Sequence, residues 1–256
     1  MIKELFIISL YASPVILFFA ALSPLLRKRF GSRCMYFIWL FIAVRLIIPF
    51  RISFPAPVEN RLPDVSDVVT YVENRAISNA PIAASDVAAP VVHKRAISTR
   101  DLLPFIYIAP AAAILAFRLI SYAVFIISLR PGLEEKESYR TLRVFSSPRV
   151  ASPMLIGFFF PKVIMPHVSY STSEMQMILK HEYTHYKRRD IWYKLLLSIA
   201  LALHFFNPFI YIMCYLANRD LELSCDEIVV KDTDISFRKD YSNAILKSIK
   251  VRNGKK

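Results

Sequence analysis

The stretch ILKHEYTHYKRRD (178–190) contains the pattern HExxH, formed by His181, Glu182 and His185. On a helix, histidines four residues apart lie one turn apart on the same face, so both imidazoles can reach one metal ion. A glutamate beside the first histidine can take a proton from a metal-bound water. This spacing predicts zinc-assisted hydrolysis of a polarised carbonyl, with His181 and His185 as ligands and Glu182 as base. The alternative is a polar helical turn, since the same short pattern occurs in unrelated helices.

A catalytic zinc ion needs a third protein ligand and an open fourth position. In the metzincin pattern, glycine and histidine would stand where this chain has Arg188 and Ile191, so that continuation is absent. Asp190 follows His185 by five residues. At about 100° per residue, an uninterrupted helix would point Asp190 away from the metal. The third ligand is therefore expected further along the chain.

The segment ANRDLELSCDE (217–227) offers that ligand. Glu222 and Asp226 are four residues apart, so they lie on one face of a predicted helix. We expect Glu222 to complete the ligand set, and Asp226 to orient a ligand or to bind the metal directly. The alternative is a pair of surface acids near Arg219.

The elements that must position these residues belong to a membrane protein. Of the 256 residues, 55% are hydrophobic, and the mean hydropathy is +0.40. About 20 apolar residues cross the hydrocarbon core of a bilayer. Three blocks reach about that length: 5–26, 34–50 and 102–129. We predict a mainly α-helical integral membrane protein whose first part, 1–129, contains three transmembrane helices.

Charge placement predicts the orientation of these spans. Loop 27–33, RKRFGSR, carries four basic residues and no acid, whereas 51–101 carries six basic and six acidic residues. By the positive-inside rule, 27–33 is cytoplasmic, the N-terminus and 51–101 are extracellular, and the chain from 130 onward starts in the cytoplasm. The net charge of +13 is then mainly a topology signal. Direct nucleic-acid binding is not expected, because no aromatic and basic binding module accompanies the charge.

Residues 130–256 are predicted to form a cytoplasmic and partly membrane-embedded zinc-metallopeptidase domain. The stretch 131–140 has the composition of a polar connector, and 143–166 predicts short strands of a small β-sheet, limited by prolines. Ser171 and Glu174 have capping-box spacing, which predicts the start of the helix that carries HEYTH. The stretch 237–252 is expected to form a basic amphipathic helix, at the membrane surface or against the catalytic layer.

Between the two motifs lies a mostly apolar stretch, 191–217. As one helix, its 27 residues would measure about 40 Å and would place Glu222 across the membrane from His181. Asn207–Pro208 favours a turn, because the residue before proline disfavours helix. We therefore predict a helical hairpin with limbs of roughly 22 Å that dips into the bilayer without crossing it. Its return brings Glu222 to the level of His181.

Taken together, these motifs resemble the membrane zinc metallopeptidases of the BlaR/MecR type, β-lactam sensor-transducers that trigger cleavage of a repressor. The matching stretches are WLFIAVRLIIPF (39–50), LIGFFFPKVIMP (155–166), HEYTH (181–185) and NRDLELSCDE (218–227). The resemblance implies a gluzincin-like centre with zinc on His181, His185 and Glu222. It also implies that Glu182 is the catalytic base and that Asp226 lies close to the metal.

The resemblance further implies that GFFFPKVIMP is a strand beside the active site. Its expected substrate-binding part is Gly157, Phe158, Phe159 and Phe160. An extended substrate would pair with the edge of this strand through backbone hydrogen bonds. Sensor members of the family continue into an external penicillin-binding domain, whereas this sequence ends about 30 residues after Asp226. β-Lactam sensing is therefore not expected of this chain, which is either a truncated member or a short relative.

The resulting prediction is a multi-pass cell-membrane zinc endopeptidase with its active site on the cytoplasmic side. It would cleave a cytoplasmic or membrane-proximal protein, such as a transcriptional repressor, in signal-dependent proteolysis. Expected partners are the protein substrate and the lipid bilayer. A homodimer with a second copy of the chain is compatible with the sequence. One alternative is a zinc-binding signal transducer without peptidase activity, against which Glu182 argues, because a purely structural zinc site needs no base. Another is a membrane-protein quality-control protease.

Overall fold

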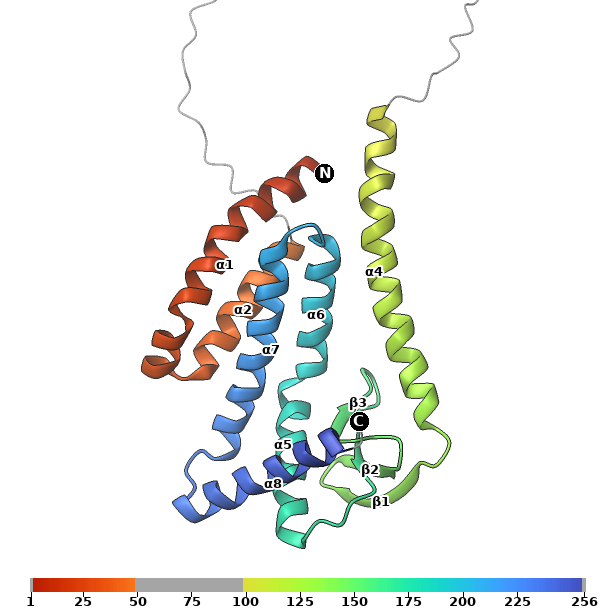
Figure 1. Ribbon diagram of the computed structural model, residues 1–256, viewed down its shortest axis with the longest axis vertical. Helices are drawn as coiled ribbons and strands as arrows, with labels where there is room; N and C mark the ends of the chain where they lie inside the picture. The colour runs from red at the N-terminus through yellow and green to blue at the C-terminus, as the bar shows by residue number, and fades with distance from the viewer. Residues whose placement is uncertain (1, 49–98, 255–256) are drawn as a thin grey trace, which may run out of the picture. The chain divides into compact units, whose positions relative to one another are not determined.

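The computed structural model describes residues 2–48 and 99–254 (Figure 1). The described residues 2–48 and 103–254 belong to one compact unit. The expected extracellular loop 51–101 therefore lies almost entirely outside the described residues. The helices are α1 (Ile2–Phe30), α2 (Ser32–Ile47), α4 (Thr99–Leu129), α5 (Thr172–Arg188), α6 (Asp190–Leu203), α7 (Pro208–Val229) and α8 (Ile235–Gly254). The strands are β1 (Glu134–Tyr139), β2 (Leu142–Ser147), β3 (Met154–Ile156) and β4 (Lys162–Pro166).

Helix α2 lies at the centre of a bundle with α1, α6 and α7 (Figure 1). Its buried residues recur every three or four positions, as one face of a helix requires. They are Ser32, Met35, Tyr36, Trp39, Ile42, Ala43 and Leu46. This face packs against buried residues of the other helices, including Ile16, Leu197 and Met213. The bundle is therefore built around the second of the three predicted spans.

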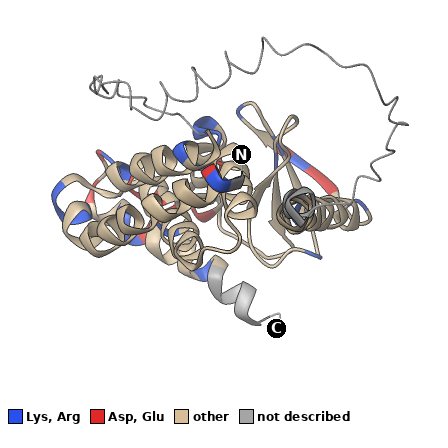
Figure 2. Cartoon of the chain, turned by 90° about the horizontal axis from the view of Figure 1, so that it is seen from above, with Lys and Arg blue, Asp and Glu red and all other residues tan. Residues whose placement is uncertain are grey.

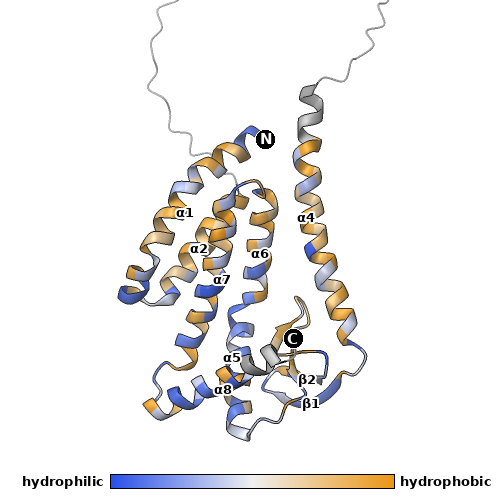
Figure 3. Ribbon diagram, in the orientation of Figure 1, coloured by the Kyte–Doolittle hydropathy of each residue, from blue (hydrophilic) through white to orange (hydrophobic). Residues whose placement is uncertain are grey.

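Within the described residues, two helices are long and apolar enough to cross a membrane, Lys3–Phe30 and Phe105–Leu129. Only 11% and 6% of their most apolar windows are buried within the protein. A helix that is apolar all round and not covered by protein requires another apolar medium, which a bilayer supplies. Figure 3 shows hydrophobic colour along α1, α2 and α4, and hydrophilic colour over α8 and β1. In Figure 2 most of the helical ribbon is tan, the colour of uncharged residues. The three-span count and the orientation stay predictions.

The turn predicted in 191–217 is confirmed: α6 ends at Leu203 and α7 begins at Pro208. The side chain of Asn207 caps α7, since its Oδ1 accepts a hydrogen bond from Phe209 N at 2.9 Å. Its Nδ2 donates to Ser9 Oγ and Ser13 Oγ of α1, both at 2.8 Å. Polar groups at the tip of an apolar hairpin need such partners, because lipid offers none. Asn207 thus both forms the turn and fastens it to α1.

The four strands form a sheet in the order β1-β2-β4-β3. Strand β2 pairs antiparallel with β1 and parallel with β4, and β3 pairs antiparallel with β4. The prediction of a connector over 131–140 is wrong, because Glu134–Tyr139 is an edge strand. Five of its six residues are exposed, so its sequence lacks the alternation that indicates a half-buried strand. The small sheet predicted over 143–166 is confirmed.

The prediction of a strand over Gly157, Phe158, Phe159 and Phe160 is wrong. These residues form the turn between β3 and β4. Gly157 has φ +96°, and a Cβ there would lie 2.4 Å from Phe160 O, so the turn requires glycine. The free edge on this side of the sheet belongs to β3, which contacts α5.

Candidate metal centre

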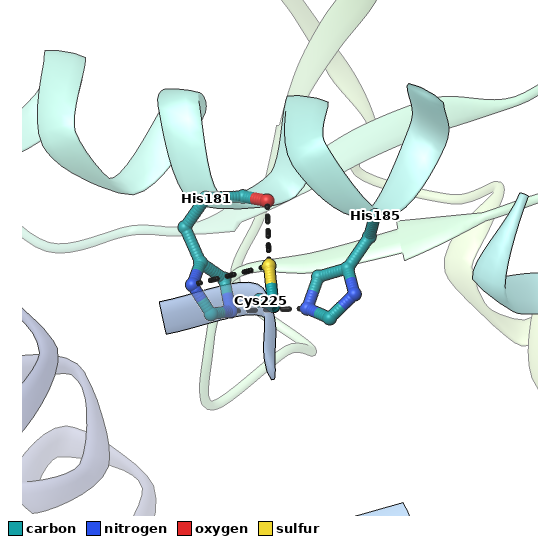
Figure 4. A group of neighbouring side chains, drawn as sticks. All are labelled: His181, His185 and Cys225. Carbon is teal, nitrogen blue, oxygen red and sulfur yellow. Dashed lines mark hydrogen bonds between the residues drawn. The ribbon is translucent and has the colours of Figure 1, made fainter. Parts of the chain in front are cut away.

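Helix α5 presents the two histidines as the sequence predicted. The Ser171–Glu174 capping box is present: Ser171 Oγ accepts from Glu174 N at 3.2 Å, and Glu174 Oε2 accepts from Ser171 N at 2.8 Å. One turn apart near the other end of α5, His181 and His185 point toward each other (Figure 4). Their Nε2 atoms are 3.0 Å apart. Two imidazole nitrogens therefore converge on one point beside the helix.

Glu222 of α7 reaches the same point. Its Oε2 lies 3.2 Å from His185 Nε2 and 3.8 Å from His181 Nε2. A tetrahedral zinc ion with bonds of about 2.0–2.2 Å separates its ligand atoms by roughly 3.3–3.5 Å. The three observed separations lie around this value, so the donor set fits zinc. The side chain of Glu222 is 47% exposed, which leaves solvent access to a fourth position.

The outer ring nitrogens of both histidines are held by carboxylates. His185 Nδ1 lies 2.7 Å from Asp190 Oδ2. His181 Nδ1 lies 3.2 Å from Asp226 Oδ1 and 2.7 Å from the hydroxyl of Tyr241, on α8. A histidine that donates its Nδ1–H to a carboxylate presents the Nε2 lone pair to a metal, an arrangement common in zinc proteins. This geometry supports an orienting role for Asp226 over direct binding.

The expectation that Asp190 points away from the metal assumed an uninterrupted helix, and that assumption is wrong. Helix α5 ends at Arg188, and Arg189 adopts a left-handed conformation, with φ 59° and ψ 40°. The chain therefore changes direction before Asp190, which becomes the first residue of α6. An extrapolation at constant helical angle fails at such a break. Asp190 is almost completely buried, at 2% exposure, with its carboxylate against the His185 ring.

Cys225 lies beside the two histidines and was not predicted as a ligand from the sequence. Donor atoms of His181, His185 and Cys225 lie within 4.8 Å of one another, and the three are drawn in Figure 4. The sulfur lies 3.6 Å from the carbonyl oxygen of His181 and 3.8 Å from its Nδ1. Cysteine is a common zinc ligand, and its place three residues after Glu222 was the available signal. The sulfur approaches the outer nitrogen of His181, whereas Glu222 approaches both Nε2 atoms, so Glu222 fits the ligand role better.

The surroundings of the histidines favour a positive charge. Burial alone would lower the pKa of both rings, but their neighbours outweigh it. Asp226 is the strongest of these for His181 and Asp190 for His185, and the net effect raises both pKa values. A cation at the shared point would be stabilised by the same carboxylates that hold a proton.

The pKa values of Glu222 and Cys225 are lowered, the opposite of the change at the two histidines. Burial would raise the pKa of the Glu222 carboxyl, but its contacts with His181 and His185 lower it overall. Burial would likewise raise the pKa of the Cys225 thiol, and the same two histidines lower it overall. The acid is therefore ionised and ready to ligate. Glu182, between the histidines in sequence, is buried at 7% exposure.

The sequence of this chain is similar to one known family and to proteins named for regulation and for methicillin resistance. The family described as BlaR1 peptidase M56 matches residues 3–256. The regulatory protein BlaR1 of Bacillus licheniformis is 32% identical over 123 residues, 46% of this chain and 20% of that protein. The methicillin resistance mecR1 proteins of Staphylococcus aureus and Staphylococcus epidermidis are each 23% identical over 234 residues, 82% of this chain and 40% of those proteins. The chain thus spans less than half the length of these relatives.

Proposed function

This chain belongs to the BlaR1 peptidase M56 family, and on that premise we propose that it is a membrane-embedded zinc metalloendopeptidase. The observation that carries the proposal is the convergence of Glu222 Oε2 on both Nε2 atoms of His181 and His185. Two motifs far apart in sequence bring three donor atoms to separations of 3.0, 3.2 and 3.8 Å, close to those of ligands around a tetrahedral zinc ion. The substrate would be a cytoplasmic or membrane-proximal protein, such as a transcriptional repressor, cut in response to a signal.

Each residue has a defined role in this proposal. His181, His185 and Glu222 would hold the ion, which when bound would supply Lewis-acid chemistry and make water a better nucleophile. Glu182 receives the proton of the attacking water and passes it to the leaving amine. Lys194 Nζ lies 3.2 Å from Glu222 Oε1 and so holds the second carboxylate oxygen away from the histidines.

We propose that the centre faces the cytoplasm, within the predicted division into a three-span region, 1–129, and a metallopeptidase domain, 130–256. Support comes from contacts with the basic turn of loop 27–33. Ser32 N donates to Glu227 Oε1 at 2.7 Å, and Arg27 forms an ion pair with Asp220 at 3.4 Å. The loop that the positive-inside rule assigns to the cytoplasm therefore adjoins the helix that carries Glu222.

The substrate is proposed to lie along β3 in an extended conformation. Free backbone groups on a sheet edge can pair with an added strand, while neighbouring pockets select side chains. A pocket of about 470 Å³ lies beside this edge, and its lining includes Leu155, Phe158, Tyr186 and Trp192. The residues Gly157–Phe160 would then contact the substrate from a turn and not from a strand.

Replacement of the base tests the proposal. Glu182→Gln should retain zinc and lose cleavage of a membrane-proximal reporter, because the amide cannot accept the proton. Glu174→Gln, at the start of the same helix, is the matched control and should keep both. Equal cleavage by Glu182→Gln and wild type would reject the peptidase. Zinc-loaded but inert wild type would favour a zinc-binding transducer, and unselective cleavage of membrane proteins would favour quality control.

A further inference from the structure

Three polar contacts join α2 to the segments that carry the candidate metal centre. Each runs from a donor on α2 to a carboxylate outside it: Ser32 N to Glu227 Oε1 at 2.7 Å, Tyr36 OH to Asp190 Oδ1 at 3.3 Å, and Trp39 Nε1 to Asp220 Oδ2 at 2.8 Å. Spacings of four and three residues put the side chains of Ser32, Tyr36 and Trp39 on one helical face, although Ser32 donates through its backbone amide. A helix of the membrane bundle thus contacts both segments that supply the site, the α5–α6 junction and α7.

The contact of Tyr36 continues to a candidate metal ligand. Asp190 Oδ1 accepts from Tyr36 OH, and Asp190 Oδ2 lies 2.7 Å from His185 Nδ1. Tyr36, Asp190 and His185 are all buried, with exposures of 8%, 2% and 7%. Where water is excluded, a carboxylate oxygen without a hydrogen-bond partner costs free energy. Both hydrogen bonds of the Asp190 carboxylate are therefore favoured over arrangements that leave one of its oxygens unpaired. The hydroxyl on α2 therefore helps to fix the plane of the carboxylate that orients the histidine.

Arg188 contacts both Asp190 and Tyr36. Its Nε lies 3.3 Å from Asp190 Oδ1, and its guanidinium carbon lies 4.3 Å from the centre of the Tyr36 ring. Tyr36 in turn stacks on Tyr193 of α6, with ring centres 4.6 Å apart. The hydroxyl of Tyr36 is thereby held in place by packing on both faces of its ring. A movement of α2 would have to carry Asp190 with it or break the contact.

We propose that Tyr36 is a positioning residue of the metal centre, which acts through Asp190 to set the orientation of His185. Together with Trp39 and the start of α2, it keeps the His-bearing and Glu222-bearing segments in register. The inference rests on the proposed function, because it assumes that His185 is a zinc ligand. It gives this family member a direct physical route from a membrane helix to the metal: displacement of α2 reorients an imidazole that binds the ion.

Zinc affinity of the full-length chain in lipid nanodiscs tests this route without relying on catalysis. Competition with a chelator should show that Tyr36→Phe binds zinc about 2- to 10-fold more weakly than wild type, the effect of losing one modest hydrogen bond. The visible absorption of the cobalt-substituted protein should change as well, because it reports ligand orientation. Tyr193→Phe is the matched control. It removes the hydroxyl of the stacked ring, which contacts Tyr36 O at 3.4 Å, and should alter neither readout.

A double-mutant cycle separates positioning from general packing. Asp190→Ala should weaken zinc binding by about 10- to 100-fold, as loss of an outer-shell partner does. In that background Tyr36→Phe should have no further effect, since its hydroxyl acts through Asp190. An undiminished effect there, or a Tyr36→Phe protein that matches Tyr193→Phe in both readouts, overturns the inference alone. Wild type that fails to bind one zinc ion per chain overturns the metal centre and the inference together.

Discussion

The identity of the third ligand can be decided by comparing Glu222→Ala with Cys225→Ala. Glu222 Oε2 lies 3.2 and 3.8 Å from the two Nε2 atoms, whereas Cys225 Sγ contacts the carbonyl oxygen and Nδ1 of His181. A structural zinc site with four ligands binds with about 10–16 kcal/mol, hence roughly 2.5–4 kcal/mol for each ligand. Glu222→Ala should therefore reduce zinc affinity by roughly 10²- to 10³-fold. Cys225→Ala should reduce it by less than about tenfold, because the thiol adjoins both histidines without converging on their Nε2 atoms as Glu222 does.

Chelator competition measures both affinities, and the cobalt-substituted protein gives an independent readout. A thiolate bound to cobalt adds strong near-ultraviolet absorption, which should be absent from wild type and unchanged in Cys225→Ala. Ser224→Ala, the adjacent residue on α7, controls for substitution in that helix. The reasoning is refuted if Cys225→Ala loses the larger share of the affinity, or if wild type shows the thiolate band. Either result would assign the metal to His181, His185 and Cys225.

Three further predictions concern the hairpin, the protons at the centre and the turn beside it. Asn207→Ala should lower the free energy of unfolding by about 1–3 kcal/mol in a detergent titration, because the cap of α7 and the hydrogen bonds to α1 are lost. An unchanged free energy of unfolding would contradict the idea that Asn207 fastens the hairpin to α1. Zinc affinity should keep rising above pH 6.5, because the pKa values of His181 and His185 are raised and zinc must displace their protons. The rise should be up to about tenfold per pH unit for each displaced proton. A zinc affinity that is independent of pH above 6.5 would disprove the prediction. Gly157→Ala should slow cleavage of the reporter without changing the zinc content, because the added Cβ would clash with Phe160 O and distort the turn. Normal cleavage by this variant would show that the turn has no role in substrate binding.

Structural features that depend only on residues close together in the sequence were predictable. The capping box of α5 and the spacing of HEYTH require only neighbours within one or two turns, and both appear as expected. Asn207–Pro208 likewise ends one helix and starts the next for local reasons: the amide caps the new helix, and proline occupies its first turn. From these local signals alone, the return of Glu222 to the histidines followed.

Features that depend on tertiary pairing were not predictable in the same way. Strand β1 is nearly all polar and exists because β2 pairs with it, so its own sequence carries no strand pattern. The role of Asp190 depends on one left-handed residue, Arg189, that interrupts the helix and redirects the next side chain. Left-handed backbone at an arginine is uncommon, and nothing in the local sequence requires it. The contact of Cys225 with His181 required knowledge of how α7 approaches α5.

The length of the hairpin bears on which substrates the proposed peptidase could cut. Helix α6 has 14 residues and Glu222 follows Pro208 by 14 residues, so both limbs measure about 21 Å between the tip and the level of the site. This is less than the roughly 30 Å of a hydrocarbon core. With the tip fastened to Ser9 and Ser13 on the apolar stretch of α1, the centre lies near the end of α1 that carries Arg27. On the proposed orientation and function, the zinc site would lie close to the inner membrane surface, and a soluble substrate would have to bring its scissile bond to that surface before cleavage.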